Sequence, residues 1–279
     1  MQQRFERPAS IAQAARLLAA SRWAVLAGGT DLYPAHVGRR IALPLLDVTG
    51  IAELRGIRRD DDGWSIGATT TWTDVVRAEL PPLFDALKAA AREVGGVQIQ
   101  NTGTVAGNLC NASPAADGTP VLLALGASVV LRSERGERAL PVEQFVLGNR
   151  RTARAADELV VAVRIPGRSA RARSAFAKLG GRRYLTISVT TVALVVDADE
   201  HGAIRFASAA VGSCSATPRR LPALEARLVG ARADSDLARL LAAADLAPLA
   251  PIDDLRASAA YRLDASITLL RRALQELRA

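Results

Sequence analysis

The chain contains few residues of the kinds that hold metals or form disulfides. It has two cysteines and two histidines in 279 residues. Two cysteines cannot build a disulfide scaffold, nor hold an iron–sulfur cluster by themselves. Two histidines do not favour a histidine-rich zinc site. No metal site is therefore predicted in this chain.

The signatures of several common enzyme classes are also absent. The sequence has no P-loop, no G-x-G-x-x-G dinucleotide fingerprint, no H-E-x-x-H zinc motif and no G-x-S-x-G nucleophile elbow. The sequence contains loops of distinctive composition but few side chains that could act as acids or bases. We therefore expect the chemistry to come from a bound cofactor. No catalytic residue is predicted in the chain itself.

Lysine and aromatic residues are scarce, which limits how the positive charge can be used. The net charge is +8, lysine occurs only at Lys88 and Lys178, and aromatics make up 4%. The arginines are scattered singly and in pairs, and there are too few aromatics to stack bases. Nucleic acid is therefore not predicted as a ligand, and acidic partner subunits are the alternative explanation for the charge.

No hydrophobic run is long enough to cross a membrane. The longest, Pro120 to Leu131, is well short of the roughly 18 apolar residues that a spanning helix needs. Charged residues near the start interrupt any apolar core of a signal peptide. A cytoplasmic protein without a membrane span is expected.

The order of predicted elements indicates an α+β chain. Residues 1–52 have the pattern of a small α/β unit with parallel strands: helix 10–20 capped by Ser10, strand 23–27, a helix from 31 to about 37, and strand 43–48. The next part is predicted to be an antiparallel-sheet unit with helices at 73–79 and 83–94, and a further helix that Thr119 caps. Three antiparallel strands (174–179, 188–197, 204–211) and then helices are predicted for the last part.

These patterns predict two domains. The first, residues 1–168, consists of the units 1–52 and 53–168, and the second covers residues 169–279. The boundary is placed in the Pro-Gly-Arg-rich loop at 166–173.

Two segments have the composition of phosphate-binding turns. Residues 27–31 read Ala-Gly-Gly-Thr-Asp directly after a strand, and residues 104–108 read Thr-Val-Ala-Gly-Asn within a non-periodic stretch, 95–118, which is predicted to be a long functional loop. Glycines allow backbone N–H groups to approach an anion, and a helix N-terminus favours negative charge. A carboxylate would repel a phosphate, so Asp31 is predicted to cap the helix instead. A Gly-Gly turn is common on its own, whereas two such turns suit a diphosphate held from both sides.

The two segments and the sequence around them resemble the signatures of a known protein family. Residues 25–32 read VLAGGTDL, and residues 98–117 read QIQNTGTVAGNLCNASPAAD. Both resemble signatures of the FAD-binding medium subunit of the molybdenum hydroxylases, the xanthine dehydrogenase and carbon monoxide dehydrogenase type. Similarity continues through 66–68, 174–182 and 254–262, so the resemblance covers nearly the whole chain. The second signature is long, which makes it far more specific than a lone glycine motif.

The resemblance implies an FAD site between the first two units of the chain, and it implies a role for each matching residue. The residues implied to wrap the FAD diphosphate are Val25, Leu26, Ala27, Gly28, Gly29, Thr30, Asp31, Leu32, Thr104, Val105, Ala106, Gly107 and Asn108. Those implied at other parts of the cofactor are Asp117 (hydroxyls), Val94, Tyr184 and Lys178 (flavin region) and Leu159 (adenine end). As alternatives, Tyr184 is a buried strand tyrosine and Lys178 a lysine on the rim.

One departure from the family pattern concerns the second turn. Ala106 stands where the family usually has glycine. If residue 106 needs a positive φ, the alanine methyl would cost roughly 1 kcal/mol and weaken FAD binding. If its φ is negative, alanine is harmless.

The resemblance also implies partners. A large subunit carries molybdopterin, a small subunit carries two [2Fe–2S] clusters, and the protomer is a heterotrimer that is often doubled. This chain then takes electrons from the clusters and passes them from FAD to an external acceptor. Two alternatives remain open: a stand-alone flavoprotein oxidoreductase, for which only Tyr184 could be a base, and a scaffold subunit that has lost FAD.

Overall fold

The computed structural model describes residues 4–277. The N-terminal part contains a parallel sheet in the order β1 (Phe5–Glu6), β3 (Leu45–Asp47), β2 (Ala24–Leu26). Helix α1 (Ile11–Ala20) begins as predicted, because the Ser10 hydroxyl accepts from the Gln13 N–H. Its buried face (Ala14, Ala15 and Leu18) packs against the neighbouring sheet. The predicted parallel α/β unit is confirmed.

The middle part is built on a five-stranded antiparallel sheet. Its order is β4 (Ile57–Arg59), β5 (Gly63–Gly67), β10 (Leu159–Pro166), β6 (Ser128–Ser133), β7 (Gly136–Pro141). The helices are α2 (Trp72–Arg77), α3 (Asp85–Glu93), α4 (Val97–Thr102), α5 (Val105–Asn111), α6 (Gly118–Ala124) and α7 (Val142–Phe145), and a small hairpin joins β8 (Val146–Gly148) to β9 (Arg151–Thr152). The predicted antiparallel-sheet unit is confirmed.

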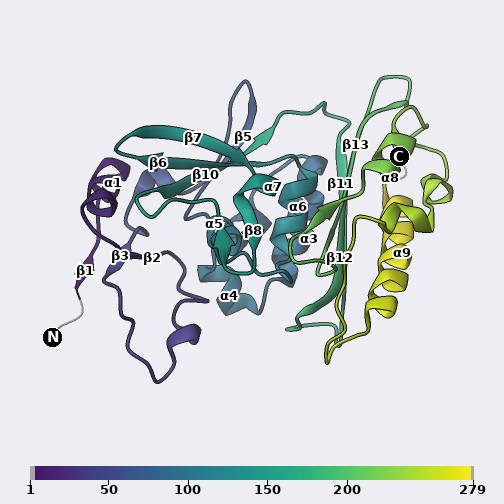
Figure 1. Cartoon of the computed structure of the whole chain (residues 1–279). Helices are drawn as coiled ribbons and strands as arrows, with labels where there is room; N and C mark the ends of the chain where they lie inside the picture. Colours follow the sequence, from purple (N-terminus) through teal and green to yellow (C-terminus); the bar gives the residue numbers. More distant parts are fainter. Residues whose placement is uncertain (1–3, 278–279) are drawn as a thin grey trace.

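The C-terminal part is a second antiparallel sheet with helices on both faces. Its strands are β11 (Arg173–Gly180), β12 (Ser188–Ala198), β13 (Ile204–Gly212) and the short β14 (Arg219–Arg220), which adds an edge to the three predicted strands. Helices α3 and α6 cover one face, while α8 (Pro222–Leu228) and α9 (Ala259–Glu276) cover the other (Figure 1). Successive strand residues point to opposite faces, so Leu194 belongs to the core beneath α9 whereas Val195 belongs to the core of the middle part.

Three local predictions were wrong. Residues 31–37 form turns around a short 3-10 helix, Pro34–His36, rather than an α-helix. Pro34 interrupts the run of backbone donors, and Val37 is 81% exposed, so the segment has no apolar face to bury. The stretch 95–118 is not one loop, because α4 and α5 lie within it. Helix α6 begins at Gly118, one residue before Thr119, whose buried Oγ1 has no partner.

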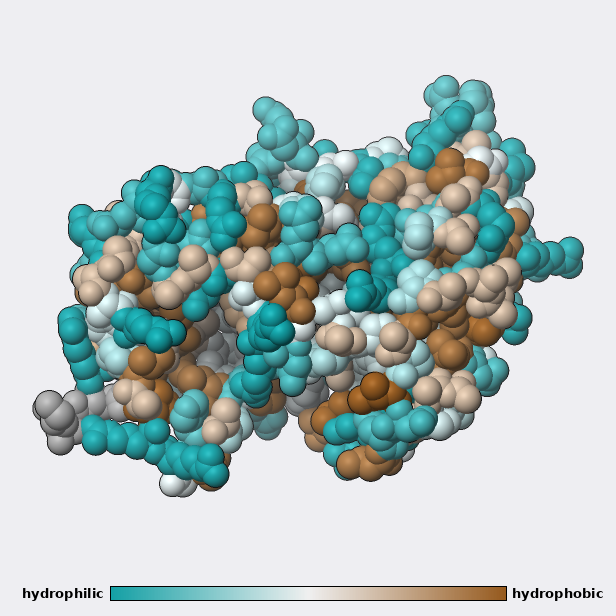
Figure 2. Space-filling model, in the orientation of Figure 1, coloured by the Kyte–Doolittle hydropathy of each residue, from teal (hydrophilic) through white to brown (hydrophobic). Residues whose placement is uncertain are grey.

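No helix within residues 4–277 is long and apolar enough to cross a membrane. On the face drawn in Figure 2, hydrophobic side chains form small separate patches among hydrophilic ones.

Candidate functional site

The two glycine-containing turns lie on opposite sides of one cavity. The cavity measures about 570 Å³ and lies where the parallel sheet meets α4, α5 and the β9–β10 segment. That volume is within the range of small-molecule and cofactor sites. Fourteen of the eighteen predicted cofactor residues line it: Val25, Leu26, Ala27, Gly28, Gly29, Thr30, Asp31, Leu32, Val94, Thr104, Ala106, Gly107, Asn108 and Leu159.

Gly28 brings the first turn into direct contact with the backbone at the end of α4, just before the second segment. A Cβ at this position would lie 2.0 Å from the carbonyl oxygen of Thr102 and 2.9 Å from the Cα of Gly103. The next residue, Gly29, has φ +67°, a conformation that side chains with a Cβ rarely adopt. Glycine is therefore required at 28 for close approach and at 29 for the turn itself.

Helix α5 supplies the other side of the cavity. Thr104 caps it, because its hydroxyl accepts from the Gly107 N–H at 3.0 Å. Ala106 lies inside the helix and is not among the described residues with positive φ, so its methyl group causes no backbone strain. Asn108 also lines the cavity, and its Oδ1 atom is buried without a hydrogen-bond partner, facing Gly118.

Asp31 does not cap a helix. Both of its carboxylate oxygens accept from the Arg150 guanidinium at 3.0 Å, in a bidentate ion pair that joins residues 119 apart in the sequence. No α-helix starts at this position, so the predicted cap has no free N–H groups to bind. Arg150 itself lines the cavity.

Four predicted residues lie outside this cavity. Val105 is fully buried in the core, on the face of α5 that points away from the cavity. Tyr184 lies in the β11–β12 connection and is 62% exposed, so it is not a buried strand tyrosine. Lys178 lines a separate cavity of about 470 Å³. Asp117 is buried and lines neither cavity.

Asp117 and Lys178 form a buried ion pair. The Lys178 Nζ lies 2.7 Å from Asp117 Oδ2 and 3.3 Å from the Glu93 carbonyl oxygen, and the two charged side chains are 7% and 8% exposed. Ser188 donates to Asp117 Oδ1 at 2.6 Å. Burial raises the pKa of Asp117, and the charge of Lys178 opposes that rise. Lys178 is therefore an enclosed partner of Asp117 rather than a rim lysine.

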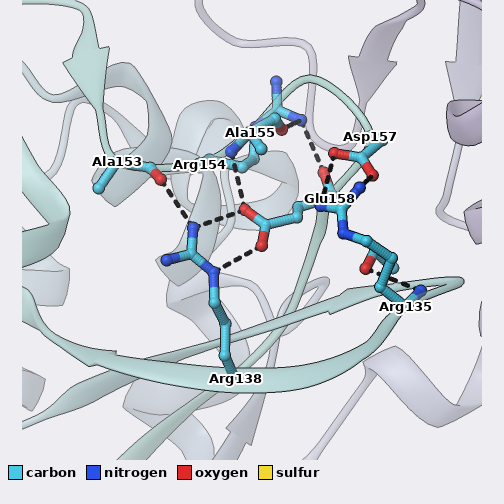
Figure 3. Close-up of polar contacts among 8 residues, drawn as sticks. Arg135, Arg138, Ala153, Arg154, Ala155, Asp157 and Glu158 are labelled. Carbon is cyan, nitrogen blue, oxygen red and sulfur yellow. Dashed lines mark hydrogen bonds and ion pairs between the residues drawn. The ribbon is translucent and has the colours of Figure 1, made fainter.

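The cavity includes charged residues that the sequence patterns did not indicate. Arg150, Arg154 and Glu158 line it together with the motif residues. Glu158 is 4% exposed and accepts from Arg138 at 2.6 and 2.8 Å and from the Ala155 N–H at 2.7 Å (Figure 3). The only available signal was the strong charge of the segment before strand β10.

Replacing Glu158 with glutamine should destabilise the protein in a pH-dependent way. The hydrogen bond from Arg138 lowers the pKa of Glu158 below its usual 4.5. A carboxyl whose pKa is lower in the folded state stabilises the fold above its unfolded pKa, and this contribution is lost as the pH falls through the folded value. We expect Glu158→Gln to cost about 1–2 kcal/mol at pH 7, and less at pH 3.

Urea unfolding at both pH values measures this difference. Glu137→Gln is the control, because Glu137 is 39% exposed and pairs with Arg164 at 3.3 Å. If Glu158→Gln lowered the free energy of unfolding equally at pH 7 and pH 3, the ionised carboxylate would contribute nothing to stability.

The fold and the cavity define a class: an α+β protein with a cofactor cleft between two glycine-containing turns. Residues 1–168 match the family model described as FAD binding domain in molybdopterin dehydrogenase. Residues 174–277 match the one described as CO dehydrogenase flavoprotein C-terminal domain. The chain therefore belongs to the FAD-binding subunits of the molybdenum hydroxylases, oxidoreductases of the xanthine dehydrogenase and CO dehydrogenase type.

Individual relatives agree with this assignment. The chain is 34% identical over 243 residues to the caffeine dehydrogenase subunit beta of Pseudomonas sp. (strain CBB1), covering 84% of this chain and 80% of the relative. It is 31% identical over 279 residues to the carbon monoxide dehydrogenase medium chain of Hydrogenophaga pseudoflava, covering 97% and 95%. Among solved structures, reconstituted CO dehydrogenase from Oligotropha carboxidovorans superposes with a TM-score of 0.90 at 30% identity, covering 100% of this chain and 99% of that one.

Proposed function

We propose that this chain is the electron-transfer subunit of a heteromeric molybdenum hydroxylase. In this role the chain takes electrons from [2Fe–2S] clusters of a partner subunit and passes them to an external acceptor. The observation that carries this proposal is the cavity between residues 25–32 and the start of α5 at residues 104–108. Similar chains named as medium chains and subunits of dehydrogenases support a role within a larger complex.

The residues around the cavity fit an FAD diphosphate. The absence of a Cβ at Gly28 lets the first turn approach the backbone of Thr102 and Gly103, just before Thr104. We assign the diphosphate to the two turns, in which Thr30 and Thr104 contribute hydroxyls and the backbone contributes N–H groups. Leu159 is assigned to the adenine end and Val94 to the flavin end.

Asp117, Lys178 and Tyr184 are proposed near the flavin end. Lys178 donates to the carbonyl oxygen of Glu93, the neighbour of cavity-lining Val94, and this contact supports the assignment. When bound, FAD supplies a flavin ring that accepts and releases electrons. The chain's own residues bind and orient that ring and exclude water from it, and no general base is required of them.

The proposed complex contains two further subunits. These are a large subunit with molybdopterin and a small subunit with two [2Fe–2S] clusters, assembled as a dimer of heterotrimers in the cytoplasm. Within this chain, we propose a division into residues 1–168 and 169–279, which the extents of the two matching family models support.

The test is to purify the tagged full chain from its native host and to measure flavin, iron and molybdenum in the eluate. We expect flavin, iron, molybdenum and two co-purifying subunits. Flavin without metals or partners would favour a stand-alone flavoprotein. A colourless solitary chain that does not take up added FAD would indicate a scaffold subunit and would refute the proposal.

A further inference from the structure

Arg150 reaches across the mouth of the cavity to the glycine turn. Its guanidinium binds both carboxylate oxygens of Asp31 at 3.0 Å, and both residues line the cavity. The Arg150 side chain is 58% exposed and that of Asp31 is 42% exposed. A pair this exposed adds little to folding stability, so its fixed bidentate geometry needs another explanation.

The backbone of Arg150 is held in an unusual conformation. Its φ is +54°, in the left-handed region that glycine tolerates and arginine rarely adopts. Its N–H donates to the carbonyl of Ala112 at 3.4 Å, at the end of α5. Arg150 therefore connects the two walls of the cavity, since its backbone contacts the end of α5 and its side chain contacts the glycine turn. Strain of this kind is a pointer to function.

The charges around the cavity single out this arginine. Of the described residues that line it, Arg150 and Arg154 are the cations. The Nη1 of Arg154 donates hydrogen bonds to the backbone carbonyl oxygens of Glu158 and Ala155, at 2.6 and 3.2 Å. Asp31 would repel a phosphate bound at its own turn, and the bidentate contact with Arg150 neutralises that charge.

We propose that Arg150 is a binding residue for the cofactor's phosphates. This inference rests on the proposed FAD site. The ion pair with Asp31 cancels the negative charge in the glycine turn and keeps the guanidinium at the turn before ligand arrives. A phosphate then receives charge-assisted hydrogen bonds from a group that is already ordered, which reduces the entropy lost on binding.

The experiment compares three variants of the full chain after removal of bound flavin. Arg150→Gly removes the guanidinium while suiting the left-handed backbone, so it should fold at least as well as the native chain. Arg150→Lys keeps the charge but loses the bidentate fork. Arg151→Ala removes the adjacent positive charge, which does not line the cavity. FAD and riboflavin affinities are measured by flavin fluorescence, and apoprotein stability by thermal unfolding.

We expect Arg150→Gly to weaken FAD binding about tenfold, the effect of losing one hydrogen bond to a charged group. Riboflavin affinity and the thermal midpoint should not fall, because neither depends on a phosphate. Arg150→Lys should lie between Arg150→Gly and the native chain, and Arg151→Ala should match the native chain.

Three results would overturn the inference. Unchanged FAD affinity in Arg150→Gly would mean that the ion pair is a surface contact without a role in cofactor binding. An equal loss for riboflavin would mean that Arg150 shapes the cleft without acting on phosphates, and an equal loss in Arg151→Ala would indicate only general charge attraction. If the native chain itself binds no FAD, the proposed function fails as well, so the two failures are distinguishable.

Discussion

Replacing Gly28 with alanine should abolish FAD binding. The new methyl carbon would lie 2.0 Å from the Thr102 carbonyl oxygen and 2.6 Å from its carbon. These are backbone atoms, which cannot rotate away as a side chain can, so the first turn must move away from the end of α4. The diphosphate would then lose several charge-assisted hydrogen bonds at once, and we expect affinity to fall by about two orders of magnitude or more.

The same substitution should also lower stability, because overpacking typically costs about 1–3 kcal/mol. FAD titration and urea unfolding measure the two effects. Gly181→Ala is the matched control, since a Cβ there meets nothing within 4 Å and the backbone has no positive φ. If Gly28→Ala retained FAD at native affinity, close approach of the first turn to the end of α4 would not be needed for the site.

The second large effect concerns the buried ion pair between Asp117 and Lys178. Asp117→Ala leaves a charged amine that is 7% exposed and keeps a hydrogen bond to the Glu93 carbonyl oxygen. Removing one partner of a buried pair costs about 3–5 kcal/mol. The loss should appear as a lower urea midpoint, because Asp117 at the start of α6 and Lys178 in β11 connect the middle part to the C-terminal sheet.

A double variant tests whether the cost comes from the unpaired charge. Asp117→Asn combined with Lys178→Met removes both charges and leaves an acceptor for the Ser188 hydroxyl, so most of the stability should return. Burial raises the pKa of Asp117 and the charge of Lys178 opposes that rise, so the two charges are removed together. As a control, Asp236→Ala breaks the pair with Arg239, whose side chain is 85% exposed, and should change little. If the double variant were as unstable as Asp117→Ala, the unpaired-charge explanation would be wrong.

Much of the fold could be predicted from the chain alone, because long elements repeat their hydrophobic pattern. Strands β12 and β13 and helix α1 lie close to their expected positions. Helices α4 and α5 were missed because they have six and seven residues, rich in Gly, Asn and Thr, and show no periodic apolar face. Tertiary packing stabilises α5 by burying side chains such as Val105 and Leu109, whereas α4 has no buried residue.

The same oversight bears on one predicted site residue. The resemblance implied that residues 104–108 wrap the diphosphate, and the segment was expected to be a loop. In a helix, neighbouring positions point in different directions, so Val105 enters the core while Thr104 and Asn108 face the cavity. Knowing that the segment was helical would have been enough to set Val105 apart.

The sequence by itself determined the family and the α+β order of the chain, because these depend on local composition and spacing. Only the tertiary structure brought Asp31 to Arg150, and Asp117 to Lys178. Each pair joins segments far apart in the chain, and no local pattern encodes which charge will meet which. The packing of sheets and helices decides that, because burial and distance determine whether a charged side chain binds a ligand, neutralises a neighbour or stabilises the core.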